Sequence, residues 1–493
     1  MSTDFLWMRL LIPEGIVVLT ALMVLTVDLL IVRRGLAFAR GRIAAFLTCL
    51  GCVSALAWLA LAPDTGSASM LPLTPLTQFL KCALLVLTCV TALISISVPF
   101  TRHVGECFAL LLLAATGMML LVSSDNLLLI FVALELLSLP LYILTAFNKA
   151  NLASVEAGLK YFLFGGMAAA FALFGISLLY GITGEIQLGA IASQLKRQPV
   201  EPVFYLALVM VLAGFAFKLA AAPFHFWAPD AYEGAPAPIA SFIASASKVA
   251  SFFVLARILI SGFASNAGSA VSGGYAPGWM PLLAVLAVLS IGLGNLAALV
   301  QTSVKRLLAY SAIAHTGYGL LALLGSQDRG LPALLFYVIG YALAVLGAFA
   351  VISALENSGS RARMEDFAGL SRRSPLLAFC MLVFVLSLAG IPPLPGFFGK
   401  FYVFTAAAAG PPGLGLLWLV VLAIAASVIS LYYYLQILKQ VYAVEPSGEA
   451  IALTPPILTR IAIALLCAAV IVVGCAPNLL LNRIFLVLQS SVL

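Results

Sequence analysis

Apolar runs of about 20 residues, separated by short polar links, follow one another from residue 11 to residue 482. A bilayer core about 30 Å thick needs about 20 apolar residues for each helix that crosses it. The pattern therefore predicts fourteen membrane-spanning helices, near residues 11–32, 42–62, 76–99, 106–123, 126–147, 155–181, 203–222, 237–262, 279–300, 306–325, 331–355, 375–409, 413–440 and 456–482. The twelfth run is long for one crossing and contains GIPPLPGFFGK at 390–400, so it predicts one discontinuous helix that crosses once.

The composition agrees with an all-α polytopic membrane protein. Of the 493 residues, 63% are hydrophobic and 9% are charged, and the mean hydropathy is +1.16, far outside the range of soluble globular proteins. The longest polar links, at 182–202, 263–278 and 356–374, hold about 20 residues or fewer, which is below the size of a domain. We therefore expect the protein to act within the membrane.

The basic residues are divided unevenly between the two sides of the membrane. If the link between the first two helices is cytoplasmic, fourteen of the 25 lysines and arginines fall on that side: Arg33, Arg34, Arg40, Arg42, Arg102, Lys149, Lys305, Arg306, Arg361, Arg363, Arg372, Arg373, Lys439 and Arg460. Five fall on the other side, and six remain inside the spans. Because cytoplasmic loops carry the excess of basic residues, this predicts that both termini are periplasmic. The net charge of +7 follows from this bias and gives no reason to expect nucleic acid.

The sequence carries no motif for a bound nucleotide, haem or metal. It has no glycine-rich dinucleotide fingerprint followed by a ribose-binding acid and no P-loop, and its three histidines form no haem-ligating pair. The eight cysteines are scattered, and the one C-x-x-C has no second pair or histidine beside it. We expect neither a cofactor nor a metal in this chain.

Ionisable residues inside the predicted spans are informative because a charge in hydrocarbon is costly. Glu135 lies nine residues into the fifth span, roughly 14 Å deep, and Lys248 lies eleven residues into the eighth, so both are near mid-bilayer. Lys218 and Lys400 each lie close to a proline-containing break. Four such charges indicate a site or relay for an ion. The alternative is that they form structural ion pairs that hold helices together.

Other charges in the spans have simpler interpretations. Lys160, five residues into the sixth span, can snorkel toward the interface, and on its own it is as well explained by that as by a relay. Lys81 and Arg257 lie near helix ends and are interpreted as snorkelling anchors. Asp28 and Glu14 are interpreted as interface residues or as contacts to a neighbouring subunit.

The stretch FKLAAAPFHFWAPDAYEGAPAP, residues 217–238, brings Lys218 and His225 together with four prolines. Irregular backbone at membrane depth is tolerated only where it faces protein or water, so the stretch predicts a hydrated break beside the lysine. His225 titrates near neutrality and suits a proton-transfer step, as does His315 in the middle of the tenth span. Each histidine can instead be an ordinary hydrogen-bonded residue of the core.

The broken seventh and twelfth helices are five helices apart, and an odd offset makes them run in opposite directions. Inverted repeats with broken helices at mid-membrane are common in ion-coupled transporters. We therefore divide the chain into an N-terminal three-helix segment (1–105), a first five-helix repeat (106–262), a second, inverted five-helix repeat (263–440) and a C-terminal helix (441–493).

Four motifs in order carry a resemblance that covers nearly the whole chain. They are VEAGLKYFLFG (155–165), FKLAAAPFHFWAPDAYEGAPAPIASFIASASKVA (217–250), QTSVKRLLAYSAIAHTGY (301–318) and GIPPLPGFFGKFYVF (390–404). Together they resemble subunit N of the proton-pumping NADH:quinone oxidoreductase, respiratory complex I. That family is one of the antiporter-like subunits of the membrane arm and is related to subunits of multisubunit cation/proton antiporters.

The resemblance implies roles for individual residues of the proton pathway. Glu135 becomes the partner of Lys218 on broken helix 7, Lys248 the central lysine of helix 8, and Lys400 the lysine on broken helix 12 that leads toward the periplasm. The resemblance also makes Lys160 and His225 accessory connecting positions and His315 part of the polar axis between the half-channels. Two departures from the family pattern are Ala237, where APAP replaces APTP, and Pro395, where a small residue is common.

The function implied is proton translocation driven by quinone reduction elsewhere in complex I, so the chain is expected to be a non-redox subunit of a translocase. FMN, iron–sulfur clusters and quinone are then expected in partner subunits. The expected partners are the M-type antiporter-like subunit, small membrane subunits and lipids, in a bacterial inner membrane. Two alternatives are a subunit of a multisubunit cation/proton antiporter and a structural spacer of the membrane arm.

Overall fold

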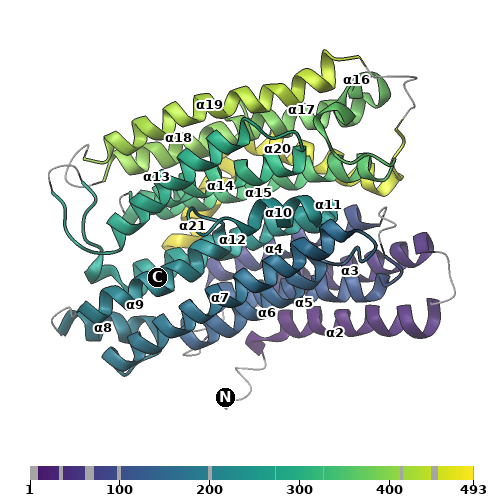
Figure 1. Ribbon diagram of the computed structural model, residues 1–493. Helices are drawn as coiled ribbons and strands as arrows, with labels where there is room; N and C mark the ends of the chain where they lie inside the picture. Colours follow the sequence, from purple (N-terminus) through teal and green to yellow (C-terminus); the bar gives the residue numbers. More distant parts are fainter. Residues whose placement is uncertain are drawn as a thin grey trace.

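The computed structural model describes residues 9–32, 37–61, 71–96, 101–197, 202–271, 274–325, 327–410, 415–445 and 453–491. Arg33 and Arg34, which enter the orientation prediction, lie outside these ranges. Within the described residues the regular structure is helical, apart from three isolated bridges. The long helices lie side by side along one common direction (Figure 1).

The helices have these bounds: α2 Ile12–Val27, α3 Ala37–Leu61, α4 Pro75–Ser95, α5 Val104–Ser123, α6 Leu127–Thr145, α7 Leu152–Thr183, α8 Leu188–Arg197, α9 Pro202–Leu219, α10 Trp227–Gly234, α11 Ala237–Ala244, α12 Ala246–Arg257, α13 Trp279–Ala298, α14 Val304–Leu323, α15 Gln327–Glu356, α16 Leu370–Arg373, α17 Pro375–Ala389, α18 Pro395–Ala408, α19 Leu417–Tyr442, α20 Ile457–Cys475 and α21 Pro477–Gln489.

The number of crossings agrees with the sequence. Twelve helices of the described chain are long and apolar enough to span a membrane. The tenth predicted span is α14, a 20-residue helix that carries His315 and several hydroxyl side chains. The twelfth is divided between α17 and α18. These two crossings bring the twelve to fourteen, and the seventh and twelfth predicted spans are discontinuous as predicted.

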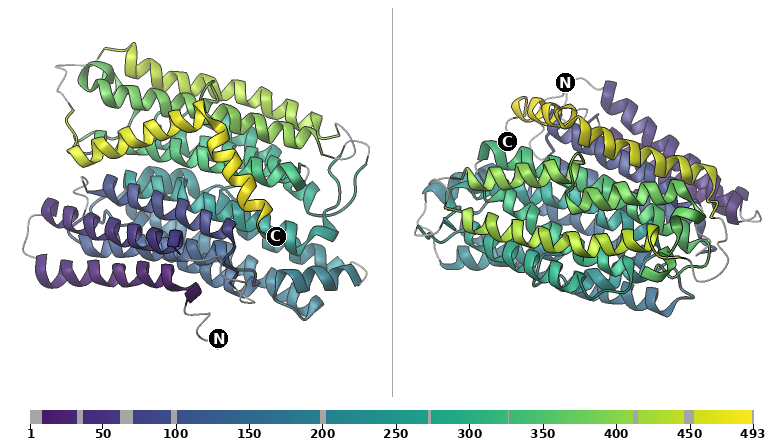
Figure 2. Two further views of the ribbon diagram at one scale, coloured as in Figure 1. Left: turned by 180° about the vertical axis from the view of Figure 1, so that it is seen from behind. Right: turned by 90° about the horizontal axis from the view of Figure 1, so that it is seen from above.

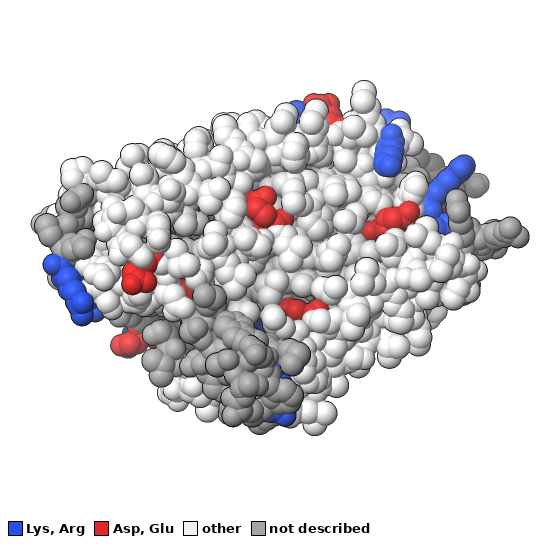
Figure 3. Space-filling model, turned by 90° about the horizontal axis from the view of Figure 1, so that it is seen from below, with Lys and Arg blue, Asp and Glu red and all other residues white. Residues whose placement is uncertain are grey.

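The helices form two groups, which Figure 1 shows one above the other. The lower group runs from α2 to α12 and the upper group from α13 to α19, and α11 and α12 pack against α15 across the boundary. The last helix, α21, runs obliquely across the back of the bundle (Figure 2, left) and contacts α4 and α15. The side seen in Figure 3 is largely uncharged, as expected for a surface that meets lipid or other membrane subunits.

Three boundaries differ from the prediction. The eighth span is not one continuous helix, because it breaks at Ser245 (φ −109°, ψ −83°) between α11 and α12 and ends in a π-helical turn, Ile258–Gly262. No proline or glycine marks this break, so it could not be predicted from the local sequence. The last span ends at Cys475 and a new helix, α21, begins at Pro477. The predicted polar link at 182–202 contains the helix α8.

The two proline breaks have the same backbone pattern at a constant offset of 170 residues. In the first, Ala220 (φ 59°) and Ala221 donate to the carbonyls of Phe217 and Ala216, and Pro223 follows a cis peptide bond. In the second, Gly390 (φ 89°) and Ile391 donate to the carbonyls of Ser387 and Leu386, and Pro393 follows a cis peptide bond. Both helices thus end in the same left-handed cap. This agreement favours the predicted repeat.

Charges that the sequence assigned to helix ends are buried in pairs. Lys81 was expected to be a snorkelling anchor, but its Nζ lies 2.7 Å from Glu14 Oε1 and both side chains are almost fully buried. Asp28, expected at an interface, accepts two bonds from Arg40 and one from the amide of Gly105. These pairs lie within the chain and do not depend on a neighbouring subunit.

Arg257 was also expected to snorkel, and it is 4% exposed. Its Nη1 donates to the carbonyls of Val122 and Ser124 and lies 3.3 Å from Asp125 Oδ1. Depth in a helix predicted the position of this charge correctly, but its partners come from residues far away in the sequence.

Candidate functional site

Lys218 lies in the last turn of α9 and is 2% exposed. Its Nζ donates to Ser138 Oγ on α6 at 2.8 Å, and Ser138 in turn donates to the carbonyl of Leu134. Glu135 lies on the same helix as Ser138, and it lines one small cavity, of about 10 Å³, together with Lys218. Within the described residues Glu135 Oε1 has no hydrogen-bond partner, and no ion pair within 4.0 Å joins it to Lys218. The two predicted partners therefore line a common cavity without forming an ion pair.

The break after α9 is stabilised by side chains that bond its freed backbone groups. Trp227 Nε1 donates to the carbonyl of Phe217, and Thr316 Oγ1 on α14 donates to the carbonyl of Leu219. The amide of Ala222 donates to Ser290 Oγ on α13. Since lipid offers no hydrogen bonds, these contacts allow the irregular backbone to lie at membrane depth.

Lys248 is 2% exposed and lies just after the break in the eighth span. Its Nζ donates to the carbonyl of Ala312 at 2.5 Å and to Thr316 Oγ1 at 2.8 Å. Thr316 therefore contacts both Lys248 and the backbone carbonyl of Leu219, four residues before Pro223. One threonine connects the first broken helix with the central lysine.

His315 lies between tyrosines in the second group of helices. Its Nδ1 is 2.6 Å from the hydroxyl of Tyr337 on α15, and its Nε2 is 3.1 Å from the hydroxyl of Tyr434 on α19. The Tyr434 hydroxyl is also bonded to Ser311. Tyr341, on the same helix as Tyr337, lies beside both His315 and Lys248, with its ring centre 5.6 Å from Lys248 Nζ.

Lys400 lies on α18 after the second break and is 5% exposed. Its Nζ donates to the carbonyl of Ala389, which the break frees, and to Ser427 Oγ, each at 2.9 Å. The same ammonium lies 5.2 Å from the ring centre of Tyr318. In the described chain no carboxylate is paired with Lys248 or Lys400.

Two predicted site residues lie apart from this buried series. Lys160 is about two-fifths exposed and is paired with Glu156 on its own helix and with Asp230 on α10. Arg306 on α14 also bonds Asp230. His225 lies in the break and stacks on Phe226, and its Nδ1 has no bonding partner among the described residues.

The structure therefore places a series of polar groups inside the bundle: the half-buried Glu135 and the buried Lys218, Lys248, His315 and Lys400. Sequence reasoning found these ionisable residues from their depth. It missed the hydroxyl-bearing residues that surround them, and these are Ser138, Ser311, Thr316, Tyr337, Tyr341, Ser427 and Tyr434. Lysine and histidine side chains that are bonded to hydroxyl groups can take up and release protons. Among the described residues no group of three or more His, Cys, Asp or Glu could hold a metal.

The fold and this buried series define a class, the antiporter-like membrane subunits. Residues 124–430 match the family described as NADH:quinone oxidoreductase/Mrp antiporter, TM. NADH-quinone oxidoreductase subunit N 2 of Acidobacterium capsulatum is 53% identical over 485 residues, which cover 96% of this chain and 98% of that one.

Solved structures of membrane complexes contain chains with the same fold. A chain of respiratory complex I from Thermus thermophilus with bound aureothin has a TM-score of 0.78 at 38% identity, covering 95% of this chain and 98% of that chain. A chain of the Mrp complex from Dietzia sp. shares the fold, with a TM-score of 0.80 at 20% identity over 97% of each chain. The chain belongs to the NADH:quinone oxidoreductase subunit N family, and it is a multi-span subunit of a multisubunit membrane complex.

Proposed function

We propose that this chain translocates protons within NADH:quinone oxidoreductase, driven by electron transfer in other subunits. The observation that carries the proposal is the set of three buried lysines, Lys218, Lys248 and Lys400, each of which donates to a hydroxyl group; His315, in the same bundle, is bonded to two tyrosine hydroxyls. Burying an ammonium group in the membrane costs free energy, and ionisable groups that face the interior of a helix bundle are typical of proton relays.

In this proposal Glu135 acts on Lys218 through the field of its carboxylate. When the charge on Glu135 or Lys218 changes, the protonation of Lys248 follows, and a proton leaves through Lys400. Lys160 lies on a charged network with Asp230 and serves as an accessory connection at one end of the bundle. We call this the basic end, because Lys305, Arg306 and Arg361 lie there. His225 is the accessory group in the first break.

The proposed setting is the inner membrane of a bacterium, with both termini on the periplasmic side and the basic end of the bundle in the cytoplasm. The partners proposed are the M-type antiporter-like subunit and small membrane subunits of the arm. FMN, iron–sulfur clusters and quinone belong to other subunits, and this chain contributes no redox centre of its own.

Replacement of Lys218 by alanine in the assembled complex tests the function. NADH oxidation and the proton gradient in inverted membrane vesicles, read by quenching of an acridine dye, should both fall at least tenfold. Lys196→Ala removes an exposed lysine on α8 and should leave both unchanged. Wild-type pumping in an assembled Lys218→Ala complex would refute the proposal.

The same preparation separates the two alternatives. A cation/proton antiporter subunit would give a pH change that depends on added sodium or potassium and that survives without NADH. A structural spacer would show less assembled complex after Lys400→Ala, with unchanged pumping for each complex that does assemble.

A further inference from the structure

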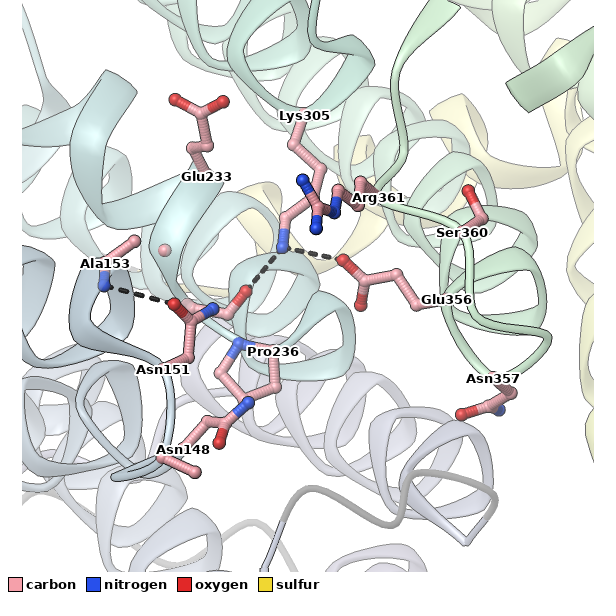
Figure 4. A pocket seen from close by; sticks show the side chains of 13 residues that line it. Asn148, Asn151, Ala153, Glu233, Pro236, Lys305, Glu356, Asn357, Ser360 and Arg361 are labelled. Atoms are coloured by element: carbon pink, nitrogen blue, oxygen red, sulfur yellow. Dashed lines mark hydrogen bonds and ion pairs between the residues drawn. The ribbon is translucent and has the colours of Figure 1, made fainter. Parts of the chain in front are cut away.

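A polar vestibule with a volume of about 690 Å³ lies at the basic end of the bundle. Residues from both groups of helices line it, including Asn151 before α7, Glu233 on α10, and Glu356 and Arg361 at the end of α15 and beyond (Figure 4). Lys305, in the first turn of α14, points into it between Glu356 and the turn that joins α10 to α11.

Lys305 and Glu356 together hold that turn through its backbone. Lys305 Nζ lies 2.9 Å from Glu356 Oε1 and donates to the carbonyl of Ala235 at 2.6 Å. The other oxygen, Glu356 Oε2, accepts from the amide of Ala237 at 3.2 Å. Ala235 is the C-cap residue of α10 and Ala237 is the first residue of α11, so one ion pair from the second group of helices holds both ends of the turn.

The clamp also explains how α11 begins without a capping side chain. Ala237 stands where the resemblance leads one to expect threonine, and Pro236, the N-cap residue, makes no side-chain hydrogen bond. The first amides of a helix carry partial positive charge and favour an anion. Here the carboxylate of Glu356 supplies that anion from a distant helix.

Buried hydroxyl groups without protein partners lie beyond the clamp. Ser353 is one turn before Glu356 on α15, and Tyr232 is on α10 immediately before Glu233. Both are fully buried, and their oxygens have no bonding partner among the described residues. The Tyr341 hydroxyl, on the tyrosine that lies against Lys248, is also unpartnered. Buried polar groups in folded proteins are bonded to protein or to water, so these three oxygens mark positions for water.

We propose that the Lys305–Glu356 pair is a gate between this vestibule and a water path that reaches Lys248 past Ser353, Tyr232 and Tyr341. While the pair is closed, it fixes the α10–α11 turn and separates the vestibule from the buried hydroxyls. When the pair opens, Ala235 and Ala237 lose their side-chain partners together, the turn loosens, and water and protons enter. The inference rests on the proposed function, because it supplies the uptake side of the same pathway.

Glu356→Gln and Lys305→Gln test the gate in the assembled complex. Each removes the charge that holds the pair and should increase hydrogen–deuterium exchange at the amide of Ala237 and through α11 at least tenfold. Each should also lower the proton gradient for each NADH oxidised at least twofold, because the vestibule is no longer closed between turnovers. Glu365→Gln removes an exposed glutamate, 79% accessible, from the neighbouring loop and should change neither quantity.

Faster exchange with an unchanged gradient for each NADH would reduce the pair to a structural contact and overturn the gate, as would unchanged exchange. If the glutamine variants do not assemble, Glu356→Asp gives the same two measurements, because it keeps the charge and shortens the reach by one carbon. The charge reversal Lys305→Glu with Glu356→Lys should not restore pumping, since it would turn a carboxylate toward the Ala235 carbonyl and an ammonium toward the Ala237 amide. Full recovery of pumping would show that an ion pair of either polarity is enough for function. It would contradict the proposal that the pair acts through its hydrogen bonds to the Ala235 carbonyl and the Ala237 amide.

Failure of the gate and failure of the function are distinguishable. Normal coupling in Glu356→Gln together with lost pumping in Lys218→Ala rejects the gate alone. Normal pumping in Lys218→Ala rejects the proposed function, whatever the exchange experiment gives.

Discussion

Removal of the Ser138 hydroxyl is the most direct perturbation of the first lysine. Within the described residues, Lys218 Nζ donates a hydrogen bond to one acceptor, Ser138 Oγ, at 2.8 Å. An ammonium has three donors, and the adjoining cavity of about 10 Å³ has room for about one water. A hydrogen bond to a charged group contributes about 1.5–3 kcal/mol. The loss of this bond therefore corresponds to about a tenfold to hundredfold change in the population of the present position of Lys218.

We expect Ser138→Ala to turn Lys218 toward Glu135, whose Oε1 is unpartnered across the cavity. The two charges would then form a tight pair, and proton pumping should fall about tenfold or more at normal assembly. Ser138→Cys keeps the volume with a poor acceptor and should behave like alanine, whereas Ser138→Thr keeps the hydroxyl and should retain most of the activity.

The assay is the dye-detected proton gradient in inverted vesicles, normalised to NADH oxidation and to the amount of assembled complex. Wild-type pumping in Ser138→Ala would refute the positioning role. So would a threonine variant as poor as alanine, because the hydroxyl would then not be the group that matters.

Two further changes examine the buried pair in the N-terminal segment and the second break. Lys81→Ala should lower stability by about 3–5 kcal/mol, because Glu14 would stay buried without its cation, and the melting temperature of the purified complex should fall. The double change Lys81→Met with Glu14→Leu should recover most of the lost stability. An unchanged melting temperature in the single variant would contradict the prediction. Gly390→Ala should cost about 1–2 kcal/mol for its left-handed backbone, φ 89°, and should lower pumping because the new Cβ would lie 3.1 Å from Lys400 Cδ. Gly359→Ala has a similar φ of 92° with no atom within 4 Å, so equal pumping in the two alanine variants would show that crowding of Lys400 has no effect.

The sequence predicted the parts of the site that depend on depth and on proline. The bounds of an apolar run predict how deep a residue lies in the membrane, so the sequence alone could place Lys218, Lys248 and Lys400 inside the membrane. It could not predict Ser138 or Thr316. Hydroxyl residues are common in membrane helices, and these two meet their lysines across 80 and 68 residues of sequence.

The same limit explains the errors at helix ends. Lys81 has the depth of a snorkelling residue, and only the packing of α2 against α3 and α5, and of α4 against α3 and α5, places Glu14 beside it. The break at Ser245 contains neither proline nor glycine, so no local rule could mark it. Both features depend on tertiary contacts, which cannot be predicted from the hydrophobic periodicity of the sequence.

The two proline breaks have the same backbone pattern but carry their lysines at different positions. At the offset of 170 residues, given by 390 − 220 and by 393 − 223, the caps and cis prolines coincide. The lysines do not: 218 + 170 leads to Leu388, and 400 − 170 leads to Asp230. Lys218 precedes its break and donates to Ser138 Oγ. Lys400 follows its break and donates both to Ser427 Oγ and to the Ala389 carbonyl that the break sets free. The position of Lys400 in the first half is occupied by an acid that pairs with Lys160 and Arg306 at the basic end. A repeated break therefore carries its lysine before the break in the first half and after the break in the second half.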